Sequence, residues 1–138
     1  MAIICSQLLD QISLAQTFYN PSLGKLHHLG FLVGSGIDLN NNFNFEKLIF
    51  HELMKAKMGY FYYQDLCIEL IQPLEGSILH AKQPQHSEYL FDHCCYEVTS
   101  IESFTTGINI SNFYTELFGS NVAFFLLDDL TKIELIEK

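Results

Sequence analysis

The sequence contains no arginine and no tryptophan, so its seven positive charges are all lysines. Sixteen acidic residues give the 138-residue chain a formal net charge of −9 at pH 7. A chain this acidic repels a phosphate backbone, which argues against nucleic acid as a partner. The absence of arginine also removes the usual bidentate clamp for carboxylates and phosphates.

The sequence also lacks long apolar runs, paired cysteines and a basic N-terminus. No run reaches the length of a membrane span, and no Lys or Arg precedes Lys25, which makes the N-terminus a poor signal peptide. The cysteines form no Cys-x-x-Cys pair, so we expect reduced thiols and no cysteine-rich zinc site. These features predict a cytoplasmic protein without a membrane partner. The four cysteines are Cys5, Cys67, Cys94 and Cys95.

Enough apolar sequence is present for one domain, or for two small halves that share a core. Apolar residues make up 49% of the chain and charged residues 17%, which excludes a disordered chain. Residues 1–24 are predicted to be a helical extension that covers the outside of a sheet and ends at Pro21 and Gly24. Self-association in a homodimer is the alternative role for this helix. Its apolar face comprises Ile4, Leu8, Ile12, Ala15 and Tyr19.

The rest of the chain, residues 25–138, contains an internal repeat. The segment at 28–33 corresponds to 93–98, and the segment at 68–72 corresponds to 133–137. The spacing from His28 to Glu69 is 41 residues (69 − 28), and the spacing from His93 to Glu134 is again 41 (134 − 93). Each copy therefore begins with a His in a short apolar segment and ends with a Glu in another. This repeat defines two modules, 25–73 and 89–138.

Hydrophobic periodicity predicts the same elements in both modules: one strand, a short helix and about three further strands. We therefore expect an α+β fold in which two βαβββ modules, related by pseudo-two-fold symmetry, form a half-open sheet with a metal-binding cleft. In the first module, strands are predicted at 26–33, 60–63 and 66–71, a short helix within 38–49, and a tight turn at Gln64-Asp65. In the second, strands are predicted at 91–98, 108–114, 122–127 and 132–136, with a helical turn at 101–106 and a tight turn at Asp128-Asp129.

Strand alternation decides which histidine of the first module belongs to a site. In an extended strand His28 and His27 face opposite sides of the sheet, and His27 corresponds to Asp92 in the second copy. The repeat therefore selects His28 as the partner of His93, and we expect His27 to point away. Two imidazoles with Glu69 and Glu134 balance one divalent ion, with Zn, Ni, Co, Mn and Fe all suitable. The alternative is that the glutamates line the solvent face of an ordinary sheet and the histidines are incidental.

The order of these segments resembles the vicinal oxygen chelate superfamily, which includes glyoxalase I, bleomycin resistance proteins and extradiol dioxygenases. The resemblance is carried by residues 26–30, 68–74, 92–98 and 122–126, and it is strongest to the methylmalonyl-CoA epimerase-like branch. It implies metal ligands at His28, Glu69, His93 and Glu134. It also implies proton transfer α to a carbonyl through a metal-stabilised enolate, with Glu134 as ligand and base and Glu52 as a second base.

Three functions follow from these observations. The first is a metal-dependent isomerase or lyase, glyoxalase- or epimerase-like, that acts on a small-molecule carbonyl substrate. The second is a non-catalytic protein of the same fold that binds and sequesters a small molecule. The third, an extradiol-type oxygenase, needs only two His and one carboxylate, so the fourth predicted ligand argues against it. Asn40-Asn41-Asn42 replaces the usual helix after the first strand, and Glu69 stands where the epimerases usually carry Gln.

Overall fold

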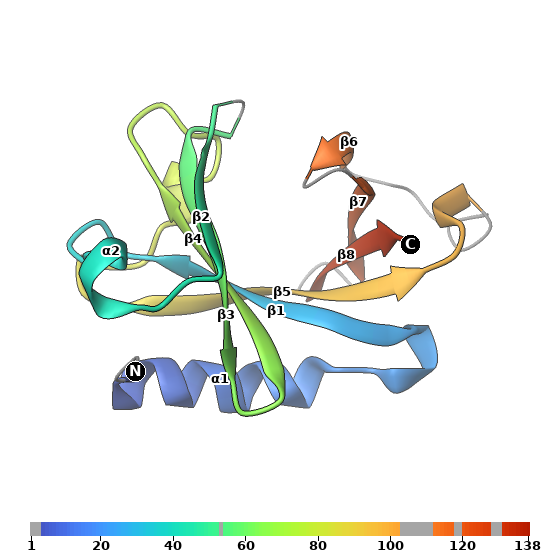
Figure 1. The fold of residues 1–138 in the computed structure, drawn as a ribbon, viewed down its shortest axis with the longest axis horizontal. Helices are drawn as coiled ribbons and strands as arrows, with labels where there is room; N and C mark the ends of the chain where they lie inside the picture. Colours follow the sequence, from blue (N-terminus) through green and yellow to red (C-terminus); the bar gives the residue numbers. More distant parts are fainter. Residues whose placement is uncertain (1–3, 53, 103–111, 118–119, 128–130) are drawn as a thin grey trace.

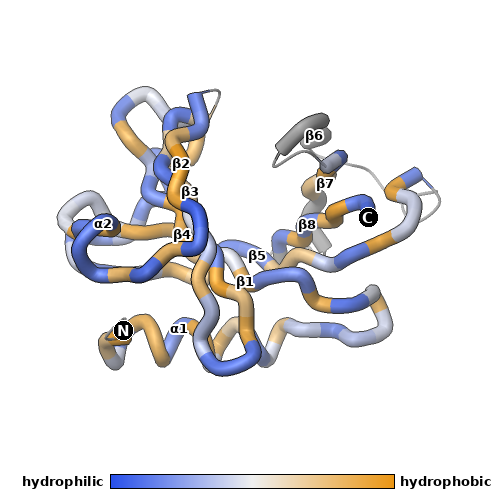
Figure 2. The backbone as a smooth tube through the Cα atoms, viewed as in Figure 1, coloured by the Kyte–Doolittle hydropathy of each residue, from blue (hydrophilic) through white to orange (hydrophobic). Residues whose placement is uncertain are grey.

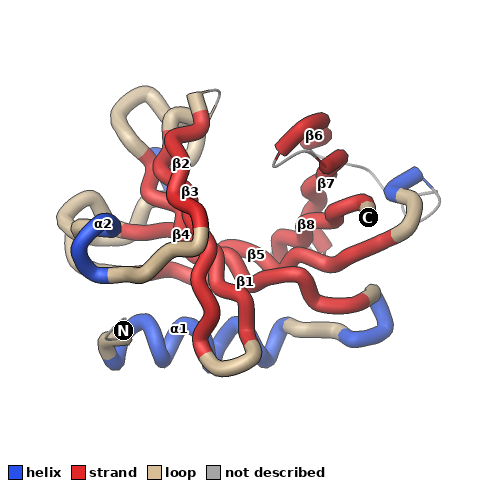
Figure 3. The backbone as a smooth tube through the Cα atoms, in the orientation of Figure 1, coloured by secondary structure: helices blue, strands red, loops and turns tan. Residues whose placement is uncertain are grey.

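The computed structural model describes residues 4–52, 54–102, 112–117, 120–127 and 131–138. These residues form an eight-stranded mixed sheet that curls into a half-barrel, with little helix (Figures 1 and 3). None of the described helices is long and apolar enough to span a bilayer. The helices are α1 (Ser6–Phe18) and α2 (Leu39–Asn42). The strands are β1 (Lys25–Val33), β2 (Lys47–His51), β3 (Ala56–Tyr63), β4 (Leu66–Pro73), β5 (Tyr89–Val98), β6 (Asn112–Leu117), β7 (Ser120–Leu127) and β8 (Thr131–Glu137).

The strand order confirms the two-module fold. The order is β2-β3-β4-β1-β5-β8-β7-β6, so each half of the sheet repeats the other about its centre. Strand β1 runs parallel to β4, and β5 runs parallel to β8, while β1 and β5 are antiparallel neighbours. In that central pair His28 lies opposite Cys95, and Gly30 lies opposite His93. The two copies of the repeat are offset by 65 residues, which relates residue 28 to 93 (93 − 28) and residue 30 to 95 (95 − 30). The two pairs are therefore equivalent, and the pseudo-two-fold axis passes between them.

The short helix predicted within 38–49 is present, and it occupies only one turn of that range. Helix α2 covers only Leu39–Asn42, where the Asp38 carboxylate caps it by accepting from the backbone N–H groups of Asn40 and Asn41. Asn is a poor helix former, so the helix ends after one turn, and residues 47–51 form strand β2 instead. The predicted turn at 128–129, most of the helical turn at 101–106 and the start of the strand at 108–114 lie outside the described residues.

Helix α1 lies across the outer face of the two central strands, as Figure 1 shows. Its residues Leu8, Ile12 and Ala15 are buried in one cluster with the outward-facing side chains of the sheet. The Gln7 side chain fixes the helix further, because it donates to the Tyr89 carbonyl at 2.7 Å and accepts from the Tyr89 N–H at 2.8 Å. The helix therefore covers the outside of the sheet, as its apolar face predicts.

The inner face of the half-barrel carries a different set of side chains. Successive side chains of a strand point to opposite faces of the sheet. The central strands β1 and β4 are buried over most of their length, and Figure 2 shows hydrophobic and hydrophilic residues mixed along the strands. Two small apolar clusters line the inner face, one in each module, and four buried polar residues stand between the modules. The first cluster is Leu32, Met54, Ala56, Met58, Ile71 and Leu79. The second is Cys95, Val122, Phe124 and Ile136.

We predict that docking of α1 contributes strongly to stability, and two leucines of this helix provide a matched test. Leu8 is fully buried and Leu14 is 43% exposed. Leu8→Ala should lower the free energy of unfolding by about 2–5 kcal/mol, because it leaves a cavity under the helix. Leu14→Ala should cost less than about 1 kcal/mol. Urea unfolding followed by circular dichroism measures both, and equal losses would contradict the observed docking of the helix.

Candidate metal centre

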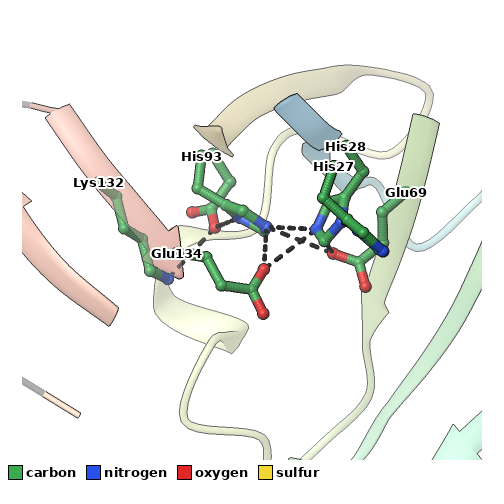
Figure 4. A network of polar contacts seen from close by, with 7 residues as sticks. His27, His28, Glu69, His93, Lys132 and Glu134 are labelled. Carbon is green, nitrogen blue, oxygen red and sulfur yellow. Dashed lines mark hydrogen bonds and ion pairs between the residues drawn. The ribbon is translucent and has the colours of Figure 1, made fainter. Parts of the chain in front are cut away.

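Four side chains from four strands meet on the inner face at the pseudo-two-fold axis: His28 from β1, Glu69 from β4, His93 from β5 and Glu134 from β8 (Figure 4). All four are buried, with exposed fractions of 1% to 3%. The two imidazole Nε2 atoms lie 3.2 Å apart. Glu134 Oε1 lies 3.0 Å from His28 Nε2 and 2.9 Å from His93 Nε2, and Glu69 Oε1 lies 3.2 and 3.4 Å from the same two atoms.

These spacings fit a divalent ion. Metal–ligand distances of about 2.1 Å place neighbouring donor atoms roughly 3.0–3.4 Å apart in octahedral or tetrahedral coordination. Glu134 Oε1 is buried, and the two imidazole Nε2 atoms at 3.0 and 2.9 Å give it no well-directed hydrogen bond. A cation between these atoms would coordinate this oxygen directly. Two carboxylates would also balance the charge of a divalent ion.

The Nδ1 atom of His93, which points away from the cluster, lies against a carboxylate. Asp92 Oδ2 lies 2.7 Å from His93 Nδ1, and Lys132 Nζ lies 3.2 Å from the same oxygen. The ammonium group of Lys132 also lies over the Phe124 ring, at 5.2 Å from its centroid. Because the carboxylate accepts from His93 Nδ1–H, a neutral His93 ring carries its lone pair on Nε2, which faces the other three donors. This carboxylate–histidine arrangement is typical of metal-binding histidines.

The expectation that His27 points away from the site is wrong. The β1–β5 register shifts between Leu26 and His28, so a β-bulge at His27 breaks the alternation of the strand. The His27 and His28 rings are neighbours in Figure 4, with their Nδ1 atoms 2.7 Å apart. Burial, and next the charge of His28, lower the pKa of His27. His27 Nδ1 therefore faces Nδ1 of His28, as Asp92 Oδ2 faces Nδ1 of His93.

Two further residues, Gly30 and Tyr60, shape the site, although neither is among the residues predicted for it. A Cβ atom at Gly30 would lie 2.2 Å from the His93 ring, so only glycine leaves room for this imidazole. Tyr60 lies opposite Glu69 in the β3–β4 register, and its ring centroid is 5.2 Å from that of His28. Burial, followed by the charge of Glu69, raises the pKa of Tyr60, so its hydroxyl stays protonated and hydrogen-bonds Glu69. The sequence already contained a signal for this contact, because the predicted tight turn at Gln64-Asp65 places Tyr60 opposite Glu69 in the β3–β4 hairpin.

The cluster is electrostatically self-consistent without an ion. Burial alone would lower the pKa of His28, but the charges of Glu69 and Glu134 outweigh it and raise the pKa. The pKa of His93 is raised well above its ordinary value, again against the effect of burial, by Asp92 and both glutamates. Burial would raise the pKa values of Glu69 and Glu134, but the two imidazoles lower both. The metal-free site therefore keeps protons on its imidazoles, and an ion would replace them.

Two cavities flank the cluster. A small one, about 30 Å³, lies directly against Glu69, His93 and Glu134 and has room for little more than a small functional group. A second cavity of about 630 Å³ has the size of a small-molecule site, and His27 and Tyr60 form part of its wall. The small cavity is completed by Met54, Met58, Ile71, Ile78, Leu79, Asp92, Phe124 and Lys132.

The structure does not bring the predicted second base, Glu52, to the cluster. Glu52 is exposed in the turn between β2 and β3, and it is not among the described residues that line either cavity. Met54 and Met58, which follow Glu52 in the chain, do line the small cavity. A catalytic role for Glu52 stays a prediction, whereas Glu134 lies at the centre of the cluster.

Comparisons with known proteins support the fold. No family model and no curated protein matches the sequence. Among solved structures, methylmalonyl-CoA epimerase from Mycobacterium tuberculosis is similar, with a TM-score of 0.65, 16% identity, and coverage of 89% of this chain and 94% of that chain. The hypothetical protein BH1468 from Bacillus halodurans C-125 gives a TM-score of 0.64 at 20% identity, with coverage of 83% and 94%. A Streptomyces coelicolor methylmalonyl-CoA epimerase variant in complex with 2-nitronate-propionyl-CoA gives 0.64 at 14%, with coverage of 83% and 97%. The chain therefore has the vicinal oxygen chelate fold, as predicted.

The shifted pKa values predict how the stability of the metal-free protein depends on pH. The raised pKa values of His28 and His93 give stability that is fully present below their ordinary value of 6.5 and is lost as pH rises through the folded pKa. The lowered pKa values of Glu69 and Glu134 give stability that is present above 4.5 and is lost as pH falls. The cluster should therefore stabilise the metal-free fold most between these two values.

Urea unfolding of chelator-treated protein from about pH 5 to pH 9 measures this dependence. We expect the free energy of unfolding to fall above about pH 6.5, and to fall less steeply in the His93→Gln variant, which lacks one titrating group. Added divalent ion should reverse the trend, since coordination requires neutral imidazoles. A metal-free stability that rises steadily from pH 6 to pH 9 would contradict the assigned charges.

Proposed function

We propose that the protein is a metal-dependent isomerase or lyase that moves a proton α to a carbonyl group. The observation that supports this most directly is the buried cluster of His28, Glu69, His93 and Glu134 beside a small cavity. In a purely structural ion pair the imidazole N–H groups would point at the carboxylates. Here the two Nε2 atoms lie 3.2 Å apart and give Glu134 Oε1 no well-directed hydrogen bond. The cluster is therefore better explained as a centre that binds an ion and reacts than as a structural link between the modules.

All four residues would bind the ion, and Glu134 would also transfer the proton. A divalent ion, when bound, supplies a Lewis acid that polarises the carbonyl oxygen and stabilises the charge left by proton removal. Both histidines would bind through Nε2, and Glu69, which hydrogen-bonds Tyr60, would act as a fixed ligand. Glu134 would accept the α proton and return it, because it borders the small cavity while Glu69 is held by Tyr60. Its other neighbour is the buried Cys95 thiol, a weak donor whose pKa is raised by burial and next by Glu134, so it stays protonated.

The charges of the cavity indicate the substrate class. Two carboxylates neutralise a divalent ion, and Asp92 and Lys132 neutralise each other at 3.2 Å. Lys132 is the one Lys or Arg among the described residues that line the small cavity. A neutral or singly charged carbonyl compound therefore suits this site better than a polyanion. We infer a small carbonyl group as the reacting end, with any larger body reaching beyond the cavity of about 30 Å³.

The described bases favour proton transfer on one face of the substrate. Epimerisation by two bases needs a second proton acceptor besides Glu134, but Glu69 is held by the Tyr60 hydroxyl and Glu52 lies in an exposed turn. Similar structures include methylmalonyl-CoA epimerases, one of them in complex with methylmalonyl-CoA and NH4+. Acyl thioesters are therefore one substrate class to test, together with 2-keto acids and hemithioacetals.

A second function, sequestration of a small molecule without turnover, is favoured by the cavity of about 630 Å³. Its size suits a whole organic ligand, but the four clustered residues do not line it. His27 and Tyr60 separate this cavity from the cluster, so a ligand there would not reach the ion directly. Tight binding of an unchanged compound, with no proton exchange, would replace the enzyme proposal by this one.

We predict that the purified protein binds one divalent ion per chain. His28→Ala or Glu134→Ala should abolish stoichiometric binding, because each removes one of four buried donors. His80→Ala is the matched control, since His80 is exposed and outside the cluster. Elemental analysis after dialysis, before and after chelation, measures the stoichiometry. Equal retention of metal in all three variants would exclude this ligand set.

We predict metal-dependent incorporation of deuterium from heavy water at the α carbon of a carbonyl substrate. Glu134→Gln should slow the exchange by about 100-fold or more at equal metal occupancy, because the amide cannot accept the proton. Glu52→Gln should leave the rate unchanged if proton transfer uses one face. Mass spectrometry of acyl thioesters, 2-keto acids and hemithioacetals measures the exchange. Loss of exchange in both variants would restore Glu52 as a second base.

A further inference from the structure

The two histidines of the cluster have different partners behind them. The carboxylate of Asp92 lies 2.7 Å from His93 Nδ1 and is anchored by Lys132. At the equivalent position in the first module, the imidazole of His27 lies 2.7 Å from His28 Nδ1. One histidine therefore has an anionic partner and the other a second imidazole, although the repeat makes the two positions equivalent.

The number of protons on a neutral imidazole determines which ring donates and which accepts in the His27–His28 pair. A neutral imidazole carries one proton, so His28 can bind an ion through Nε2 only if its proton is on Nδ1. That proton must then be donated to Nδ1 of His27, which lies 2.7 Å away. Nδ1 of His27 can accept it only if the proton of His27 is on Nε2. His27 in this one tautomer therefore holds the ring orientation and the tautomer of His28 that coordination requires.

We infer that His27 is a positioning residue of the metal centre, which orients His28 through the Nδ1–Nδ1 contact as Asp92 orients His93. The inference rests on the proposed metal site. It assigns a role that strand alternation excluded, and the β-bulge at His27 is the local feature that makes the contact possible. His27 also lines the cavity of about 630 Å³.

Substitutions at this position separate positioning from packing. His27→Leu removes the acceptor and should weaken Co²⁺ affinity by about 10- to 100-fold. His27→Asp copies the arrangement at Asp92 and should restore affinity to the wild-type level or beyond, although it changes the shape more. Tyr62→Leu is the control, since Tyr62 lines the same cavity and is not in the cluster. Competition between Co²⁺ and a chromogenic chelator measures each affinity, and circular dichroism confirms that each variant folds.

The tautomers provide a second measurement on the wild-type chain. In zinc-loaded protein labelled with ¹⁵N, long-range ¹H–¹⁵N spectra of the six histidines should show His28 protonated at Nδ1 and His27 protonated at Nε2. His27 protonated at Nδ1, or wild-type affinity in the His27→Leu variant, would overturn the positioning role and leave the metal site intact. Equal weakening by Leu and Asp would show that His27 acts through packing. A wild-type protein that binds neither Co²⁺ nor Zn²⁺ would refute the metal site and the inference together.

Discussion

The mutual compensation of two buried carboxylates and two buried imidazoles is the interaction on which the rest of this structure depends. Glu69 and Glu134 are 2% and 3% exposed, and isolated charges at such depth are strongly unfavourable. The central strand pair brings His28 and His93 to the axis, and the parallel neighbours β4 and β8 bring one glutamate each. Any change of register in these four strands would leave at least one charge uncompensated, so the same interaction selects the strand pairing and creates the site.

Helix α1 resolves a problem that the shortened first module creates. The helix after β1 is reduced to Leu39–Asn42, too short to cover the outer face of the central strands. Helix α1, which precedes both modules, packs on that face instead. Its glutamines hold the start of β5, where Gln7 pairs with both backbone groups of Tyr89 and Gln11 accepts from the N–H of Phe91 at 2.7 Å. The inner face therefore remains open for chemistry while the outer face is closed.

The fold and the four clustered residues were predictable because they depend on signals that a repeat preserves. Alternation placed Glu69 and Glu134 on one face, and the 65-residue offset paired them with His28 and His93. The position of His27 was not predictable, because a β-bulge shifts the register without any mark in the hydrophobic pattern. The close approach of the His93 ring to Gly30 depends on two strands 63 residues apart in sequence (93 − 30), so no local pattern indicates it. The position of Glu52 was also not predictable, because it depends on strand β2 ending at His51, and the hydrophobic pattern does not predict that strand.

The unequal surroundings of the two modules have a consequence for the orientation of any bound molecule. A cluster with perfect two-fold symmetry would have two identical sides, so a molecule would bind equally well in two orientations related by the axis. In this chain His27 and Tyr60 stand on one side of the axis, and Asp92 and Phe124 occupy the corresponding positions on the other. The donor atoms keep the symmetry of the repeat, but the walls around them do not. The duplicated and nearly symmetric cluster therefore has two distinguishable sides, so a molecule that approaches it meets different neighbours in the two orientations that the axis would otherwise make equal.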